Sequence, residues 1–175
     1  MCGLLTAAAL RISPRRALGI YAATFKLLIW AIVTVCSVLG LAYVMNLAGM
    51  TITLGMWAAG AGGFFAFLSP IVGWFGTAVT GSDTSSNSLF GALQVAAAHH
   101  ARLSPTLLAA ANSSGGVLGK MVSPQNLAIG AAAVGLAGRE GDIFRKVIGW
   151  SLLFLLIMAV LVLLQSTGVL SWMVP

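Results

Sequence analysis

The chain has 175 residues, of which 59% are hydrophobic and only 7% are charged. A soluble domain normally carries about 25% charged residues, so nine basic and three acidic side chains are too few to cover a surface that faces water. The net charge of +6 does not indicate nucleic-acid binding, because the basic residues flank apolar blocks, as they do in cytoplasmic loops beside membrane spans. We therefore expect an all-α polytopic integral membrane protein.

Residues 1–10 are apolar, and the basic cluster follows them instead of preceding them. A signal peptide has the opposite order, and ten residues are too few to cross a bilayer. We interpret 1–10 as the remnant of a transmembrane helix, which favours a fragment or a truncated reading frame. Residues 11–26 are predicted to form a basic cytoplasmic loop, and 27–175 to form the transmembrane domain.

Two long stretches, 27–82 and 147–175, contain no charged residue. A helical crossing needs roughly 20 apolar residues, so the sequence predicts about three full transmembrane helices, at 27–46, 52–68 and 147–165. The second is rich in glycine and alanine, which is typical of closely packed membrane helices.

The segments 69–98 and 104–137 are apolar but interrupted. Ser69-Pro70 and the tract Thr80–Asn87 interrupt the first, and Asn112–Gly116 with Ser123-Pro-Gln interrupts the second. Such breaks are typical of discontinuous or re-entrant transporter helices, whose half-helix N-termini favour an anionic group. Two full crossings, or ordinary extramembrane loops rich in turn residues, are the alternatives that the sequence leaves open.

Asp83 is the only acidic residue before Glu140. Inside a membrane it would cost roughly 2.5–3.5 kcal/mol or more, which favours a proton-coupling carboxylate or one that holds a coupling cation. A solvated aspartate that caps the following helix is the plain alternative. Lys120 is similarly isolated, and either pairs with a substrate carboxylate or with Asp83, or extends to the headgroup region.

His99, His100 and Arg102 indicate the interfacial end of a helix, with a proton relay as the alternative reading. A membrane-embedded enzyme that uses Asp83 and this histidine pair is a competing class. It is disfavoured because the sequence has no HExxH or GxSxG motif. The two cysteines lack CxxC spacing, so neither a metal site nor a cofactor is expected.

The strings SPIVGWFGTAVTGSDTSSNSLFGALQ (69–94) and LLAAANSSGGVLGKMVSPQNLAIGAAAVGLAGREGD (107–142) resemble the bacterial L-lactate permease family. Members carry similar GSDTSSN, AAN(S/T)SGG and GKMxSPQ strings in this order, and the resemblance covers nearly the whole chain from about residue 14. It implies proton-coupled uptake of lactate, or of glycolate in some members, across the bacterial inner (cytoplasmic) membrane.

Members of the family are several times longer, and this chain resembles only their C-terminal part. A transporter built from two halves binds substrate between them, so we expect that activity requires the missing N-terminal part. A truncated or split-carrier fragment without transport activity is the alternative. Within the family strings, the candidate substrate-binding residues are Ser82, Thr84, Ser85, Ser86, Asn87, Asn112, Ser113, Ser114, Gly115, Gly116, Lys120, Ser123 and Gln125, with Asp83 as the proton-coupling group.

Overall fold

The computed structural model describes residues 2–136 and 138–174, which contain helices and no strand. The chain divides into two compact units, Met1–Ser37 and Val38–Pro175. The first unit contains α1 (Cys2–Ala9) and the beginning of α2 (Pro14–Leu47), and α2 continues into the second unit.

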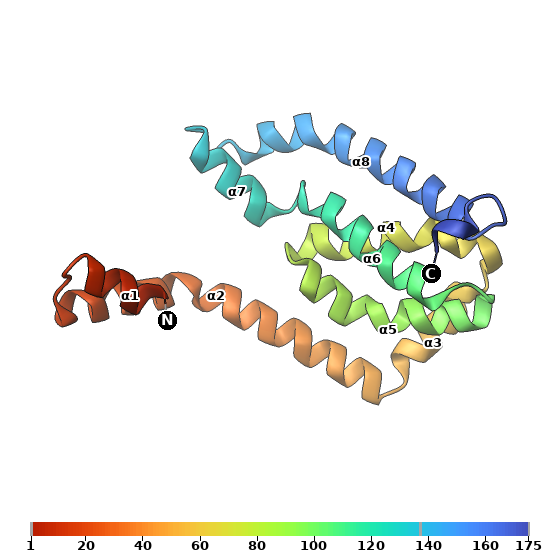
Figure 1. Ribbon diagram of the computed structural model, residues 1–175, viewed down its shortest axis with the longest axis horizontal. Coiled ribbons are helices and arrows are strands. Elements are labelled where there is room, and N and C mark those ends of the chain that lie inside the picture. The colour runs from red at the N-terminus through yellow and green to blue at the C-terminus, as the bar shows by residue number, and fades with distance from the viewer. Residues whose placement is uncertain (1, 137, 175) are drawn as a thin grey trace. The chain divides into compact units, whose positions relative to one another are not determined.

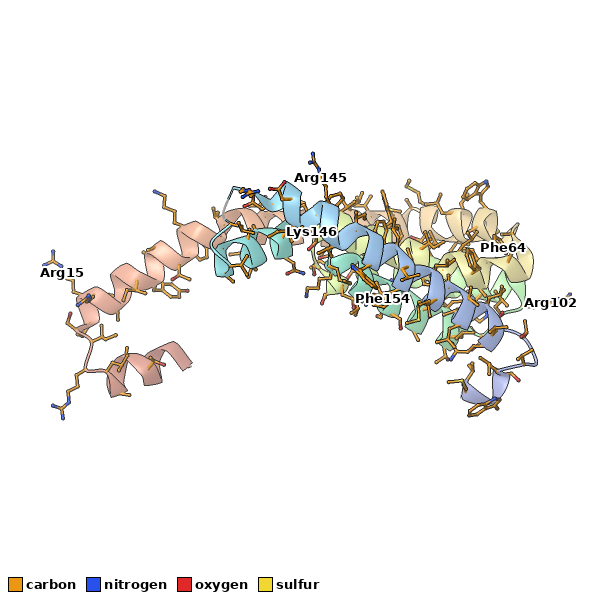
Figure 2. The ribbon with its side chains drawn as sticks, turned by 90° about the horizontal axis from the view of Figure 1, so that it is seen from above. Arg15, Phe64, Arg102, Arg145, Lys146 and Phe154 are labelled. Atoms are coloured by element: carbon orange, nitrogen blue, oxygen red, sulfur yellow. The ribbon has the colours of Figure 1, made fainter. Side chains whose placement is uncertain are left out.

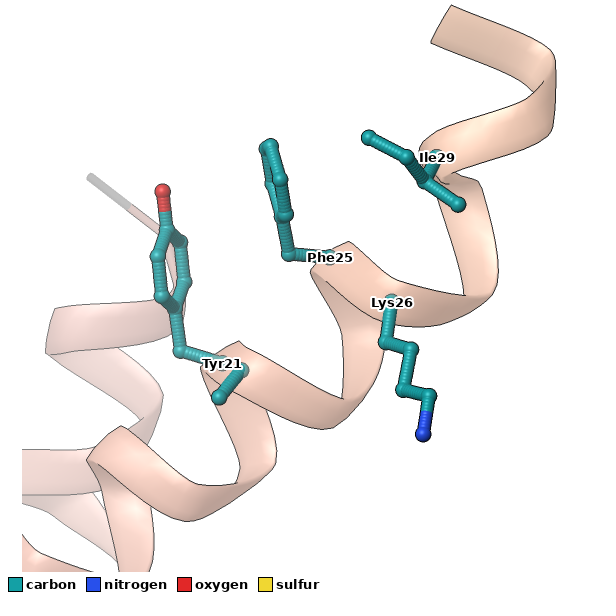
Figure 3. A pocket seen from close by; sticks show the side chains of 5 residues that line it. Tyr21, Phe25, Lys26 and Ile29 are labelled. Carbon is teal, nitrogen blue, oxygen red and sulfur yellow. The ribbon is translucent and has the colours of Figure 1, made fainter.

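The predicted basic loop 11–26 is wrong for most of its length, because α2 already begins at Pro14. Proline suits the first helical position, where its fixed φ is helical and its missing N–H would have no partner. On this part of α2, Tyr21, Phe25 and Ile29 project from one side of the helix and Lys26 from another (Figure 3). The hollow between them is lined by this single helix, so it is a feature of the helix surface rather than a built site.

The predicted crossing 52–68 is divided in the structure. Helix α3 (Met50–Ala59) ends before a glycine-rich turn, the short 3₁₀ helix η1 (Gly62–Phe64) follows, and α4 (Phe65–Thr80) begins at Phe65. Gly62 has a φ of 58°, a left-handed conformation that glycine adopts at little cost. The sequence interpretation placed the break at Ser69-Pro70, but Pro70 lies inside α4, as proline can in membrane helices whose neighbours supply hydrogen bonds.

The second unit is built around α4, α5 (Asp83–Ala101), α6 (Pro105–Lys120) and α8 (Glu140–Gln165). Helices α4 and α6 run in one direction, and α5 and α8 return in the other (Figure 1). The short α7 (Pro124–Ala133) connects α6 to α8. The buried apolar core lies between α4, α5 and α6, with Val162 added from α8.

Basic side chains stand at both ends of this second unit (Figure 2). Arg145 and Lys146 lie near the beginning of α8, and Arg102 lies at the opposite end, just after α5. Two helical stretches among the described residues, Gly62–Thr80 and Glu140–Gln165, are long and apolar enough to cross a membrane. The pair Cys36–Leu47 and Met50–Ala59, bent by 78°, would make a third if it is one span.

The predicted crossing 147–165 lies within α8, which starts seven residues earlier at Glu140. The expected interruption at Asn112–Gly116 is wrong, because α6 is continuous through this tract. The second unit does break between α6 and α7, at residues 121–123. Asparagine, serine and glycine favour turns in water, but here they face another helix, where small residues allow close packing.

Candidate functional site

Helices α4 and α6 cross with their backbones in contact and in a regular register. The Ser69 hydroxyl donates to the Leu108 carbonyl at 3.2 Å, across 39 positions. The same separation places Gly73 against Asn112 and Thr77 beside Gly116. On the adjoining edge, Gly115 contacts the Pro70 carbonyl and Gly119 contacts the Trp74 carbonyl. Any side chain at Gly73, Gly115 or Gly119 would overlap the partner backbone, so the residue types fix the crossing.

Asp83, the only acidic residue before Glu140, lies at the start of α5, directly after the break between α4 and α5. Gly81 ends α4 with a φ of 71°, and its N–H bonds the Thr77 carbonyl at 2.7 Å. The Ser82 hydroxyl then accepts from the Ser85 N–H at 3.3 Å and caps α5. Asp83 therefore occupies the first turn of α5, where the helix dipole favours a negative charge.

From Asp83, a chain of carboxamides runs into the interior of the bundle. Asn87 donates to Asp83 Oδ2 at 3.1 Å and to the Ser113 hydroxyl at 2.7 Å. Asn112 donates to Asn87 Oδ1 at 2.7 Å, and Gln94 donates to Asn112 Oδ1 at 3.1 Å. Both Gln94 and Asn112 are completely buried. A low-dielectric interior strengthens such bonds and penalises any gap among them.

Among the residues that the structure describes, three oxygen atoms of this network are buried without a hydrogen-bond partner: Asp83 Oδ1, Thr77 Oγ1 and Gln94 Oε1. Two of them converge on one point. A Cβ atom added to Gly116 would overlap Asp83 Oδ1 and would lie 2.7 Å from Thr77 Oγ1. The glycine therefore makes room for a carboxylate oxygen and a hydroxyl over the backbone of α6. A buried acceptor left unpaired costs about 1–3 kcal/mol or more, so this point is the candidate site.

The second break, between α6 and α7, lies beside the first. Gln125 donates to the Thr80 carbonyl at 3.4 Å, and a Cβ at Gly81 would lie 2.8 Å from the Gln125 side chain. The Ser123 hydroxyl and the Asn126 amide both donate to the Lys120 carbonyl, at 3.0 and 2.9 Å. The N-termini of α5 and α7 thus meet at one end of the bundle.

The structure brings together part of the predicted site. Asp83, Asn87, Asn112, Ser113 and Gly116 form one cluster. Ser86 is buried and donates to the Gly73 carbonyl at 3.2 Å, and Ser85 is buried next to it. Gly115 belongs to the helix crossing and Ser82 to the helix cap.

Other candidates lie outside this cluster. Thr84 and Lys120 are exposed, and the Ser114 hydroxyl bonds back to the Ala110 carbonyl in its own helix. Within residues 2–136 and 138–174, Lys120 forms no ion pair, so its expected pairing with Asp83 is not present. His99 and His100 lie at the other end of α5, about 24 Å from Asp83 at 1.5 Å per residue, which separates the two groups that an enzyme would need together.

Sequence reasoning missed Gln94, Ser69 and Thr77. A usable signal exists for Gln94, since it lies seven residues after Asn87, which returns to the same helix face after two turns. The part played by Thr77 and by the Ser69 carbonyl depends on α4 crossing α6, and nothing in their local sequence indicates it. Ser151 was also missed: it accepts from the Trp74 indole at 2.9 Å and donates to the Leu118 carbonyl at 2.8 Å, tying α8 to α4 and α6.

The structure thus has a polar network inside an apolar helical bundle. Comparison of the sequence with known families finds a match over nearly the whole chain. The sequence model of the L-lactate permease family matches residues 1–168. The chain belongs to the L-lactate permease family. It is 54% identical to the L-lactate permease of Bacillus subtilis (strain 168) over 144 residues, which are 82% of this chain and 25% of that protein.

Relatives in the L-lactate permease family carry two substrate names. The chain is 46% identical to the glycolate permease GlcA of Escherichia coli (strain K12), covering 90% of this chain and 28% of that protein. It is also 46% identical to the L-lactate permease of the same strain, covering 98% and 31%. The chain thus spans about a quarter to a third of the length of these curated relatives. No solved structure matches it.

Membership of this permease family explains the composition. Permeases act in membranes. Apolar helices such as α8 fit a lipid environment, because large apolar residues on them are exposed, for example Trp150 at 60% and Leu164 at 36%. The buried polar cluster then stands out, because a bilayer offers polar groups no other partners.

Proposed function

We propose that this chain is part of a secondary transporter that takes up lactate, or glycolate, together with a proton across the bacterial cytoplasmic membrane. The names of the relatives support the substrate class, a small 2-hydroxy monocarboxylate. Because the chain spans 25 to 31% of those relatives, the transport activity is proposed for the complete permease in which this segment works.

The observation that carries the proposal is the position of Asp83 in the α4–α5–α6 cluster. Its Oδ2 accepts a hydrogen bond from Asn87, while its Oδ1 is buried without a partner beside Thr77 and Gly116. An ionised carboxylate needs several donors when it is buried. Protonation removes that demand and turns the unpartnered oxygen into a donor, so this carboxyl is suited to exchange a proton during a transport cycle.

The substrate carboxylate would be held near the same end of the bundle. The N-termini of α5 and α7 meet there, and free N–H groups together with the helix dipoles attract an anion. Lys120, exposed at the end of α6, supplies a positive charge in the same region. A substrate anion and an ionised Asp83 would repel one another, so binding of the anion favours the protonated form of Asp83. This mutual preference is the proposed basis of coupling.

The relatives are about three to four times as long as the matched segment, so the segment is tested both alone and within a complete permease.

Uptake of labelled lactate is measured in membrane vesicles with and without an imposed pH gradient. The vesicles contain either this chain alone or a chimaera in which it replaces the matching segment of the Bacillus subtilis relative. We expect the chimaera to accumulate lactate only with the gradient, and its Asp83→Asn variant to lose that dependence. Asp142→Asn is the matched control, since the Asp142 side chain is 46% exposed and pairs with Arg139 at 2.7 Å.

Three outcomes would count against the proposal. Accumulation in the chimaera that is indifferent to the pH gradient would remove proton coupling. Gradient-driven accumulation that survives Asp83→Asn would remove the assigned residue. Failure of the chimaera to accumulate lactate, and glycolate in a parallel assay, with its amount in the membrane unchanged, would remove the substrate assignment. Transport by the chain alone would exclude the need for a partner.

A further inference from the structure

The carboxamide chain of the α4–α5–α6 cluster has a direction. Gln94 Nε2 donates to Asn112 Oδ1, Asn112 Nδ2 donates to Asn87 Oδ1, and Asn87 Nδ2 donates to Asp83 Oδ2. Each amide thus accepts on its oxygen and donates from its nitrogen to the next group. The last group in the series is the carboxyl that we assign to proton coupling.

One atom fixes this direction. Gln94 Nε2 also donates to the backbone carbonyl of Ser69 at 3.1 Å. A side-chain amide can be reversed by a 180° rotation, but a backbone carbonyl only accepts. Reversal of Gln94 would place its oxygen against two other acceptor oxygens in a site that water does not reach. The present orientation has an energetic cost, because Gln94 Oε1 receives no hydrogen bond from any described residue.

The consequence passes along the chain to Asp83. Reversal of Asn112 alone would set its NH₂ group against that of Gln94, and reversal of Asn87 alone would set its NH₂ group against that of Asn112. Asn87 is therefore held with its N–H towards Asp83 Oδ2. A proton on Oδ2 would face this N–H, whereas a proton on Oδ1 faces the unpartnered Thr77 oxygen and Gly116.

We infer that Gln94 is a positioning residue, which orients the amides of Asn112 and Asn87 and so directs the coupling proton to Oδ1 of Asp83. This inference rests on the proposed function, because it concerns the same carboxyl. Gln94 itself lies 11 positions from Asp83 along α5, about 16 Å at 1.5 Å per residue. It acts only through the two asparagines, and touches neither the proton nor the substrate.

Few other charges surround this carboxyl. Among the helices packed against α5, neither α3 nor α4 carries a titratable side chain, and α6 carries only Lys120. On α5 itself, His99 and His100 lie at the far end. A change in the pH dependence of uptake caused by a substitution at Gln94 therefore reports on Asp83 and the amide chain.

The test is Gln94→Met in the lactate-transporting chimaera, with the initial rate of uptake measured against external pH. Methionine keeps the length of the side chain and removes both donors. Without the anchor, the amides can reverse and Asn87 can accept a proton from Asp83, which favours the protonated carboxyl. We expect the pH of half-maximal uptake to rise by about one unit, equivalent to about a tenfold gain in proton affinity.

Two further variants make the result interpretable. Gln165→Met is the matched control: Gln165 ends α8, a helix that supplies none of the three carboxamides, and the variant should keep the wild-type profile. Gln94→Leu removes both donors and adds no titratable group, so it should shift the profile in the same direction by a similar amount. It also carries the test if Gln94→Met fails to accumulate in the membrane.

An unchanged midpoint in a Gln94 variant that is present at wild-type amounts would overturn the inference. So would the same shift in Gln165→Met. Neither result would affect the proposed function, which fails instead if Asp83→Asn retains gradient-driven uptake. Infrared difference spectra offer a second readout: the C=O band of protonated Asp83 should lie at higher frequency in Gln94→Met, because its carbonyl loses the Asn87 donor.

Discussion

Gly115→Ala tests the crossing of α4 and α6 on which the polar cluster depends. The added Cβ would overlap the Pro70 carbonyl, a backbone atom that cannot rotate away. An ordinary carbon–oxygen contact is about 3.3–3.6 Å, so the two helices must separate by about 1 Å or more. That separation would stretch the 3.2 Å bond from Ser69 to the Leu108 carbonyl. Overpacking of this kind costs about 1–3 kcal/mol.

Gly91→Ala provides the comparison, since Gly91 lies within α5 and a Cβ there would meet nothing within 4 Å. Alanine in a helix is more stable than glycine by about 0.5–1 kcal/mol, so the control should gain stability. Thermal unfolding in detergent, followed by circular dichroism, measures both. With about 2–4 °C per kcal/mol for a chain of this size, Gly115→Ala should lower Tm by about 2–12 °C. Equal or higher Tm values in both variants would refute the assigned crossing.

Three other expectations follow from the same geometry. Thr77→Val should leave Tm unchanged or raise it, because the Thr77 hydroxyl has no partner among the described residues. It should lower uptake about tenfold or more if that hydroxyl accepts the proton of Asp83. Full uptake in this variant would contradict that role. Lys120→Gln should raise KM for lactate more than it lowers the maximal rate, since an exposed charge attracts the anion; an unchanged KM would remove Lys120 from the site. With the native cysteines replaced by serine, an impermeant thiol reagent should label Thr84→Cys and spare Ser86→Cys, as their exposure indicates, and lactate should slow the labelling at position 84.

The sequence predicts the membrane-helical class well because hydropathy and charge are properties of composition. Charge-free stretches long enough to cross a bilayer must be helical, and α8 agrees with that expectation. The positions of the breaks are less predictable. Pro70 and the tract Asn112–Gly116 look like breaks locally, but both lie inside continuous helices. The residue types at these positions suit the contact between α4 and α6. No local sequence pattern indicates that contact.

The candidate site was predicted in the same uneven way. Asp83 was identifiable because a lone acid among apolar residues requires an explanation, and Asn87 and Asn112 were found as members of polar tracts. Their connection through hydrogen bonds depends on the antiparallel packing of α5 against α6. For Lys120 the sequence left three partners open: a substrate carboxylate, Asp83 or the headgroup region. Isolation in sequence carries no information about distance, and the structure exposes Lys120 at the end of its helix.

The glycine contacts between α4 and α6 also bear on how such a protein could move. Two backbones in direct contact at Gly115 and the Pro70 carbonyl, and joined by the Ser69 hydroxyl, leave little room for one helix to slide past the other. Helices α4 and α6 therefore move together as one rigid unit. Bending is cheapest where glycines with positive φ leave the chain unpacked, as at Gly62 and Gly135. Any rearrangement that exposes the polar cluster to alternate sides of a membrane would therefore take place around the α4–α6 pair and leave the contact between these two helices unchanged.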